Sequence, residues 1–252
     1  MAFDLTVLGS AGSHTGAGRA CSGYLLQSGG SRIVVDAGNG STSNLQRYVA
    51  VEDVDAIVVT HKHVDHCVDL IGMYYALRFH ADGPRSVDLY AAPEVVDNLV
   101  ALLSEDSAFE FREAFRCHEV RGGDHLSLGG FEVDVFDANH TVPTVSLRVA
   151  AEGRVLTYSS DTAGDDVLVE AAAGADLFLC EATWQGEPAD VPPGIHLTAS
   201  EAGRVAGRAG VDRLLLTHIL PTLDRDVTLE QASATWDGWL SLADDNQSWS
   251  LT

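Results

Sequence analysis

The stretch of sequence that decides the fold is His61-Lys62-His63-Val64-Asp65-His66. It follows an apolar run typical of a buried strand, residues 56–59, and precedes an apolar, helix-like segment, residues 68–74. A hydrophobic core does not accommodate three imidazoles and a carboxylate, because each polar group needs a partner once it is buried. Imidazole nitrogens and carboxylate oxygens are ligands of zinc and related cations. We therefore favour a turn that aims its first two histidines at one metal ion, and Asp65 and His66 at a second, over a polar surface turn.

Further polar residues follow other predicted strands at the point where each strand ends. These residues are His140, Asp161, Glu181 and His218. In a sheet flanked by helices, ligands bind at the carboxyl ends of the strands. A lone histidine after a strand is more often a hydrogen-bonded surface group, so the inference depends on the whole set. Taken together with the histidine stretch, the set predicts one site at the strand ends.

The predicted site contains enough donor atoms for two metal ions. The expected ligands of the first ion are His61, His63 and His140, and those of the second ion are Asp65, His66 and His218. Asp161 has two carboxylate oxygens and is expected to bridge both ions. A pair of divalent cations makes water a nucleophile near neutral pH and neutralises charge on an attacked phosphorus or carbonyl. We count Asp65 among the catalytic residues as well as among the ligands.

The composition of the chain limits its partners. The 252 residues are 46% hydrophobic, enough for a full core, and we expect a single domain over residues 1–252. The formal charge is −22, from 37 acidic and 15 basic residues, and Lys62 is the only lysine. This balance argues against a nucleic-acid partner, which needs a basic surface to displace counterions, although it does not exclude a local basic patch. The acidity fits a demand for solubility or a saline habitat, and the sequence does not decide between them.

Neither membrane insertion nor export is indicated. No apolar run reaches the ~18 residues needed to cross a bilayer. The N-terminus enters a strand pattern at once, without the basic segment of a signal peptide. The chain contains no CxxC pair, which fits free thiols in a reducing cytoplasm. We expect a cytoplasmic protein without membrane contact; a homodimer is compatible with the sequence, which does not fix the oligomeric state.

Hydrophobic periodicity predicts alternating strands and helices. The expected strands cover residues 3–8, 22–27, 32–35, 54–59, 87–90, 131–136, 145–149, 155–158, 177–180, 214–216 and 247–251. The expected helices cover residues 42–48, 68–79, 93–103, 167–173, 199–209 and 229–240. Pro93 is expected at the first turn of its helix, and residues 108–121 indicate part helix and part strand. The order of elements indicates two similar halves that divide within residues 104–130.

Two further features have open interpretations. The small-residue loop at residues 9–18 lacks the Gly-Lys-Ser/Thr ending of a phosphate loop, and is either a connector or a wall of a substrate pocket. The candidate pocket residues are Ser10, Ser13, His14 and Arg148. Asp36, at the end of a predicted strand, is either a carboxylate that orients the histidine turn or a turn or helix-capping residue.

The HKHVDH stretch, together with NHTVP (139–143), SSDT (159–162) and LLLTHI (214–219), resembles the metallo-β-lactamase superfamily. The resemblance covers nearly the whole chain. It implies an α/β fold, a four-layer αββα metallo-β-lactamase sandwich of two similar halves, with two zinc ions between the sheets; manganese or iron would also suit the site. A β-lactamase proper is not implied, because those enzymes are exported and often use cysteine at the second site. A redox di-iron branch typically carries glutamate where His63 stands.

A second set of motifs narrows the branch. CEAT (180–183), HLT (196–198), EAG (201–203) and the final TH (217–218) resemble the ribonuclease Z-like phosphodiesterases. In that branch the residues matching Glu181 and His196 form a proton relay. The resemblance therefore implies that His196 donates a proton to the leaving alkoxide and that Glu181 orients it. Such an acid helps a poor leaving group to depart. The structural alternatives are a helix-start carboxylate and a capping residue.

The resemblance also bears on the substrate. Transfer-RNA 3′-processing enzymes of this family carry a projecting Gly/Pro-rich arm and a basic surface, and this sequence has neither. The whole chain, including LCEATW (179–184), is instead similar to actinobacterial phosphodiesterases of this fold that hydrolyse cyclic nucleotides. We therefore hypothesise a dinuclear zinc phosphodiesterase that hydrolyses small 3′,5′-cyclic nucleotides to 5′-monophosphates. The alternatives are a ribonuclease Z-like transfer-RNA 3′-endonuclease, a metal-dependent ester, thioester or lactone hydrolase, and a non-catalytic metal-binding scaffold.

Overall fold

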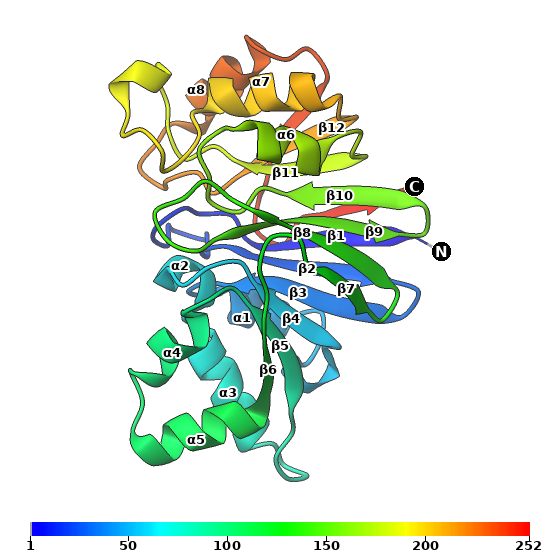
Figure 1. Ribbon diagram of the computed structural model, residues 1–252, viewed down its shortest axis with the longest axis vertical. Helices are drawn as coiled ribbons and strands as arrows, with labels where there is room; N and C mark the ends of the chain where they lie inside the picture. Colours follow the sequence, from blue (N-terminus) through cyan, green and yellow to red (C-terminus); the bar gives the residue numbers. More distant parts are fainter. Residues whose placement is uncertain (1) are drawn as a thin grey trace.

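Two mixed β-sheets of seven strands each form the centre of the computed structural model, which describes residues 2–252 (Figure 1). The first sheet contains β1 (Phe3–Gly9), β2 (Gly23–Ser28), β3 (Ser31–Ala37), β4 (Ala56–Val59), β5 (Val87–Ala91), β6 (Phe115–Glu119) and β14 (Ser248–Leu251). The second contains β7 (His125–Leu128), β8 (Phe131–Asp137), β9 (Val145–Ala151), β10 (Arg154–Tyr158), β11 (Leu177–Glu181), β12 (Arg213–Thr217) and β13 (Trp239–Leu242).

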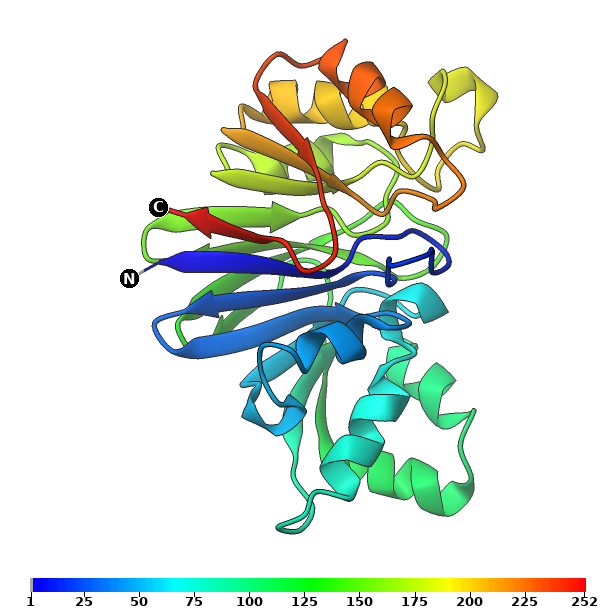
Figure 2. The same ribbon diagram turned by 180° about the vertical axis from the view of Figure 1, so that it is seen from behind.

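The two sheets repeat one pairing pattern. The order β14-β1-β2-β3-β4-β5-β6 has three antiparallel pairs followed by three parallel pairs, and so does β7-β8-β9-β10-β11-β12-β13. The C-terminal strand β14 returns to lie beside β1, where it takes the place that β7 has in the second sheet (Figure 2). The chain passes from one sheet to the other between β6 and β7, which confirms the two similar halves and their division within residues 104–130.

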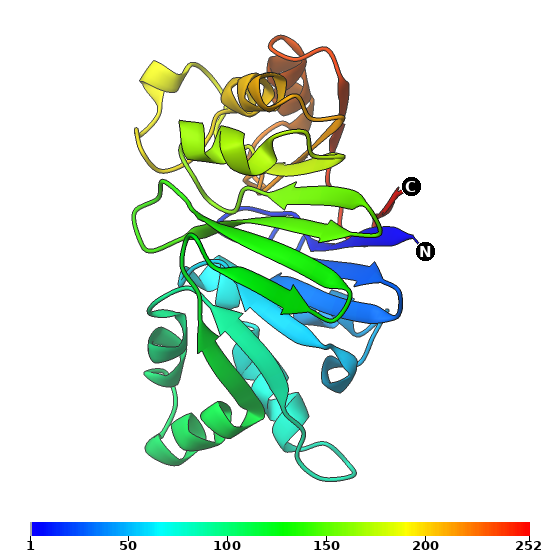
Figure 3. The same ribbon diagram turned by 45° about the vertical axis from the view of Figure 1, so that its right-hand side comes forward.

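Helices cover the outer face of each sheet, as Figure 3 shows. On the first sheet these are α1 (Ser41–Leu45), α2 (Val64–Cys67), α3 (Leu70–Arg78), α4 (Val95–Val100) and α5 (Glu105–Ala114). On the second they are α6 (Asp166–Ala172), α7 (Ala199–Ala209) and α8 (Arg225–Ser233). Short 3-10 turns lie at η1 (Val51–Asp53) and η2 (Pro188–Asp190). The layers follow the predicted αββα order. In the part of the chain that the structure describes, no helix is both long and apolar enough to cross a membrane.

Strand β11 shows how the sequence builds these layers. All five of its residues are buried, as expected for a strand covered on both faces. Side chains alternate along a strand, so Leu177 and Leu179 join the core between the two sheets. Phe178 and Cys180 point the other way, into a second apolar cluster beneath helices α6 to α8. The strand is thereby fixed on both sides, and its last residue, Glu181, is held at the strand end.

The core between the sheets includes Phe131 of β8, whose ring meets the ring of Phe3 edge-on at 5.6 Å. Both side chains are fully buried. We expect Phe131→Ala to lower the free energy of unfolding by about 3–5 kcal/mol, because it leaves a cavity between the sheets. Urea denaturation measures the change, and Phe109→Ala, at a side chain 65% exposed, should stay within about 0.5 kcal/mol. Equal effects of the two substitutions would contradict this packing.

Most predicted elements are confirmed to within a few residues, and α7 matches at both ends. Thr198 and Glu201 form a capping box at its start, and Gly210 ends it in the left-handed conformation. The prediction of a helix over residues 229–240 is wrong at both ends. The Asp224 side chain caps α8 and begins the helix four residues earlier. Residues 239–242 form β13, because they extend the second sheet beside β12.

The start of α4 and the presence of β7 also differ from the sequence prediction. Pro93 precedes α4 instead of standing in its first turn, and Glu94, in a left-handed conformation with φ of 71°, caps that helix. Strand β7 was not expected, because only Leu128 of its four residues is buried and the apolar signal is weak. It forms because it pairs with β8, in which buried and exposed side chains alternate. Residues 108–121 are part helix and part strand, as predicted.

Candidate metal centre

The structure brings the seven predicted ligands together at one end of the two sheets. His61, His140, Asp161 and His218 follow the ends of β4, β8, β10 and β12, while His63, Asp65 and His66 lie in and beside α2. Their donor atoms form two groups, in each of which all the atoms lie within 4.8 Å of one another. The first group is His61, His63, His140 and Asp161, and the second is Asp65, His66, Asp161 and His218. Asp161 belongs to both, as the sequence predicted for a bridging carboxylate.

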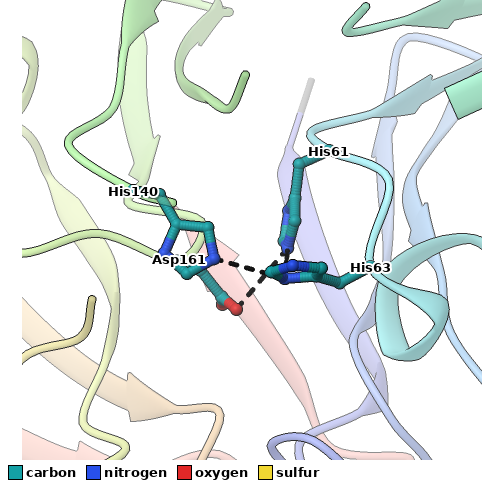
Figure 4. A group of neighbouring side chains, drawn as sticks. All are labelled: His61, His63, His140 and Asp161. Carbon is teal, nitrogen blue, oxygen red and sulfur yellow. Dashed lines mark hydrogen bonds and ion pairs between the residues drawn. The ribbon is translucent and has the colours of Figure 1, made fainter. Parts of the chain in front are cut away.

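The first group converges on a small space between the two halves (Figure 4). Nδ1 of His63 lies 3.1 Å from Nε2 of His61 and 3.2 Å from Nε2 of His140. Oδ2 of Asp161 lies 3.6 Å from the same His61 nitrogen. His61 and Asp161 are buried, whereas His63 and His140 are partly exposed. Three nitrogens and one oxygen therefore face a common point that is open on one side.

The second group is more deeply buried. Nε2 of His218 lies 3.2 Å from Nε2 of His66 and 3.2 Å from Oδ2 of Asp65. Oδ1 of Asp161 lies 3.2 Å from the His66 nitrogen and 3.4 Å from the His218 nitrogen. This Asp161 oxygen is buried and has no hydrogen-bond partner among residues 2–252. A buried, unsatisfied carboxylate oxygen is costly unless a cation or a donor lies beside it.

Hydrogen bonds at the opposite ring nitrogens show which atoms face the two groups. Nδ1 of His66 donates to Oδ2 of Asp36 over 2.7 Å, and Nδ1 of His140 donates to the Ile195 carbonyl over 2.8 Å. A neutral histidine that donates from Nδ1 has a lone pair at Nε2. His66 and His140 therefore direct lone pairs at their neighbours. Nitrogens of this kind repel one another at 3.2 Å unless a cation lies between them, so the donor set fits divalent metal ions.

The pKa shifts agree with a site built for positive charge. Burial lowers the pKa of His61 well below its usual value, so this ring stays neutral and can act as a ligand. Burial also opposes a charge on His66, but Asp161 and Asp36 outweigh it and hold the pKa of His66 well above its usual value, so Nε2 of this ring takes up a proton wherever no metal ion takes its lone pair. Burial would raise the pKa of Asp161, yet His218 and His66 hold it well below its usual value. The anionic Asp161 carboxylate among the buried histidine rings favours a cation between the donor atoms of the two groups.

Asp36 is the centre of the hydrogen bonds that support the site. Besides the bond from His66, it accepts bonds from the Thr60 backbone N–H at 2.8 Å, the Thr60 hydroxyl at 3.0 Å and the Tyr158 hydroxyl at 2.9 Å. These contacts support the interpretation that Asp36 is a carboxylate that orients the histidine turn, and not a turn or helix-capping residue. Thr60 and Tyr158 were not predicted, and Tyr158 joins the second sheet to the first at the site.

Backbone strain also occurs at the site. Asp36, Ser160 and His218 have φ angles of 57°, 53° and 53°, in the left-handed region that non-glycine residues rarely adopt. Such residues cost of order 1–3 kcal/mol each and persist where surrounding contacts fix them, often at functional sites. All three are buried at the ends of strands. The fold therefore maintains unfavourable backbone geometry to hold these side chains in place.

Glu181 and His196 meet beside the predicted ligands. Nδ1 of His196 donates to Oε1 of Glu181 over 2.9 Å, and the His196 ring lies 5.3 Å from the ring of His140 and 5.4 Å from that of His218. Neither residue caps a helix, because Thr198 is the N-cap of α7. Burial lowers the pKa of His196, but the charge of Glu181, their hydrogen bond and Asp161 together raise it to about 9. Through this pair, a proton is available at neutral pH beside the two groups.

The other candidate pocket residues are separated by the structure. The Ser13 backbone N–H donates to Oδ2 of Asp65 over 2.8 Å, so the loop at residues 9–18 borders the site. The Ser10 hydroxyl donates to Asp245, and the exposed His14 ring bonds to the Thr15 carbonyl. The prediction for Arg148 is wrong. Its guanidinium donates to two carbonyls at the end of α6, where it closes the helix and not a pocket.

Comparisons with known proteins agree with this geometry. A family described as "Beta-lactamase superfamily domain" matches residues 31–219. The chain belongs to the β-lactamase superfamily. Among its relatives in this superfamily, Uncharacterized protein Rv1339 of Mycobacterium tuberculosis is 36% identical over 239 residues, which cover 93% of this chain and 87% of the relative.

Two other proteins are similar to this chain over nearly its whole length. The crystal structure of the metallo-β-lactamase fold protein YhfI from Bacillus subtilis superposes with a TM-score of 0.89 at 26% identity and covers 100% of both chains. Ribonuclease Z of Haloferax volcanii is 28% identical, with 98% of this chain and 94% of the relative covered. That alignment extends over 303 positions, more than the 252 residues of this chain, so the ribonuclease Z contains segments that this chain lacks.

Proposed function

We propose that this protein is a cytoplasmic dinuclear zinc phosphodiesterase that hydrolyses 3′,5′-cyclic nucleotides to 5′-monophosphates. The proposed ligands are those that the sequence predicted, His61, His63 and His140 for one ion, Asp65, His66 and His218 for the other, and Asp161 for both. When bound, the two ions would neutralise the phosphate charge and make water a nucleophile near neutral pH. That the chain is a metallo-hydrolase follows from its family; the substrate and the metal are the proposed parts.

The observation that carries the proposal is the contact between Glu181 and His196. Glu181 is fully buried and holds Nδ1 of His196, which leaves the other ring nitrogen of His196 to donate a proton. An alkoxide leaves a phosphodiester slowly because it is a strong base, and a positioned acid contributes typically 10²–10⁴-fold to such a step. Ester or lactone cleavage depends less on this acid. The pair therefore favours a phosphodiester substrate.

The chain's own residues divide the reaction between them. His196, protonated at neutral pH, donates its proton to the 3′-oxygen as the bond from that oxygen to phosphorus breaks. Glu181 keeps the ring oriented, since its Oε1 also accepts the Thr162 backbone N–H over 2.7 Å and is therefore held in place itself. Water supplies the hydroxyl group that forms the new bond to phosphorus, and the remaining proton of that water replaces the one that His196 gives up. The product is a 5′-monophosphate with a free 3′-hydroxyl group.

The charge of the whole chain supports a small substrate with a single phosphate. The formal charge of −22 opposes a long polyanion, whereas a cyclic mononucleotide brings one phosphate that the two ions neutralise. The Haloferax volcanii ribonuclease Z contains segments that this chain lacks, and this difference also favours a substrate other than transfer RNA. Among residues 2–252 the cysteines are free and mostly buried, in keeping with a reducing cytoplasm.

A substrate panel tests the proposal. Purified protein supplied with zinc or manganese should convert cyclic AMP or another 3′,5′-cyclic nucleotide to the 5′-monophosphate, with no 3′-monophosphate formed. The panel also contains bis(4-nitrophenyl) phosphate, precursor transfer RNA, a thioester and a lactone, with metal content measured on the same sample. Cleavage of precursor transfer RNA without turnover of any cyclic nucleotide would refute the proposal and favour a ribonuclease Z activity.

A further inference from the structure

Thr183 lies between Glu181 and His218, two residues with different proposed roles. Its hydroxyl oxygen is 2.6 Å from Oε2 of Glu181 and 2.7 Å from Nδ1 of His218. All three side chains are buried, with at most 1% of their surface exposed. No water is needed to join them, since both distances are those of direct hydrogen bonds. Thr183 therefore connects a proposed metal ligand to the carboxylate of the proposed proton relay.

The direction of these two bonds follows from counting protons. A threonine hydroxyl has one proton to donate and can accept two bonds. The Glu181 carboxylate is the strongest acceptor within reach, and the 2.6 Å distance is typical of a hydroxyl donating to a carboxylate. The hydroxyl proton therefore lies toward Glu181. The other contact must then be a bond from the Nδ1–H of His218 to the Thr183 oxygen.

We propose that Thr183 is a positioning residue that holds His218 in the tautomer protonated at Nδ1 and ties this ligand to Glu181. In that tautomer Nε2 of His218 carries the lone pair, and this atom lies 3.2 Å from Oδ2 of Asp65 within the second ligand group. The inference rests on the proposed function, because it takes His218 as a metal ligand and Glu181 as part of the relay. One carboxylate thus orients His196 directly and His218 through Thr183.

The surroundings of His218 leave little room for another arrangement. A Cβ atom added to Gly12 would lie 2.5 Å from the carbonyl oxygen of His218 and 2.9 Å from its Nδ1, so the loop backbone is pressed against this residue. The His218 backbone is itself in the left-handed conformation, with φ of 53°. A partner water at Nδ1 would have to displace this loop. The Thr183 oxygen is therefore the acceptor on which the orientation of the ring depends.

Metal titration of Thr183→Val tests the inference without depending on catalysis. Valine keeps the shape of threonine and removes the hydroxyl. Loss of a group that orients a ligand typically costs 10- to 100-fold in metal affinity. We expect apo-protein titrated with cobalt(II) to show this weakening for one ion of the two, with the other unchanged in spectrum and affinity. Thr183→Ser, which keeps the hydroxyl, should restore the affinity to within about threefold.

A matched variant separates this effect from a general loss of stability. Thr157 of β10 is also fully buried, and its hydroxyl donates to the Ala171 carbonyl at 2.9 Å, away from the ligands. Thr157→Val should therefore bind both ions like the unmodified protein. The inference is overturned if Thr183→Val binds both ions normally, or if Thr157→Val weakens them equally. If the unmodified protein cleaves no cyclic nucleotide but Thr183→Val still loses one ion, the proposed substrate is wrong and the positioning role stands.

Discussion

Replacing Asp161 with asparagine is expected to lower kcat/KM for the hydrolysed substrate by at least about 10³-fold and to remove one of the two proposed metal ions. Asp161 is 2% exposed and is the residue shared by the two ligand groups. Asparagine keeps the shape of the side chain but loses the negative charge and turns an amide N–H₂ toward one group. A metal ion stabilises developing charge by several kcal/mol, and each 1.36 kcal/mol corresponds to a factor of ten in rate.

The measurement combines metal content with steady-state kinetics on protein reconstituted under one condition. Asp166→Asn is the matched control, because the Asp166 side chain is 92% exposed and pairs with Arg208 at the surface. It should retain two ions and activity within about twofold, since an exposed ion pair contributes little. An Asp161→Asn protein that holds two ions and keeps its activity would show that the carboxylate is not a bridging ligand.

The clustering of the seven predicted ligands could be anticipated from the sequence because of where strands end. In each sheet the carboxyl ends of the parallel strands lie at one edge, and the two sheets stack with these edges at the same end, so His61 after β4 and His218 after β12 reach the same site. The close spacing of the histidine stretch then supplied the chemistry. The prediction used the type of residue and its position relative to a strand, both of which are visible in the sequence.

The hydroxyl groups of the site could not be predicted in the same way. Threonine and tyrosine are common in strands, and their partners here come from other strands or from the opposite sheet. The bond from Tyr158 to Asp36 joins residues 122 positions apart, across the interface between the sheets. Only the three-dimensional packing decides which oxygen the Tyr158 hydroxyl meets. Arg148 shows the converse error, because its charge and its place on a strand indicated a pocket residue, whereas its guanidinium bonds to the carbonyls at the end of α6.

The pair of Glu181 and His196 leads to the second large effect. His196→Gln is expected to reduce kcat on a cyclic nucleotide by about 10²–10⁴-fold, because glutamine cannot deliver a proton to the departing 3′-oxygen. Metal content should stay at the level of the unmodified protein, since His196 belongs to neither of the two groups that the seven predicted ligands form. His118→Gln, at an exposed histidine on β6 that pairs with Asp88, is the matched control and should leave kcat unchanged.

A change of leaving group distinguishes loss of an acid from loss of structure. In bis(4-nitrophenyl) phosphate the leaving group is a weak base that departs without a proton, so His196→Gln should slow its hydrolysis less than about tenfold. A distorted site would slow both substrates alike, whereas a missing acid slows the one whose leaving group is a strong base. The ratio of the two losses therefore measures the proton transfer itself. A ratio near one, with metal content intact, would remove His196 from the reaction and return the choice of substrate to esters and lactones.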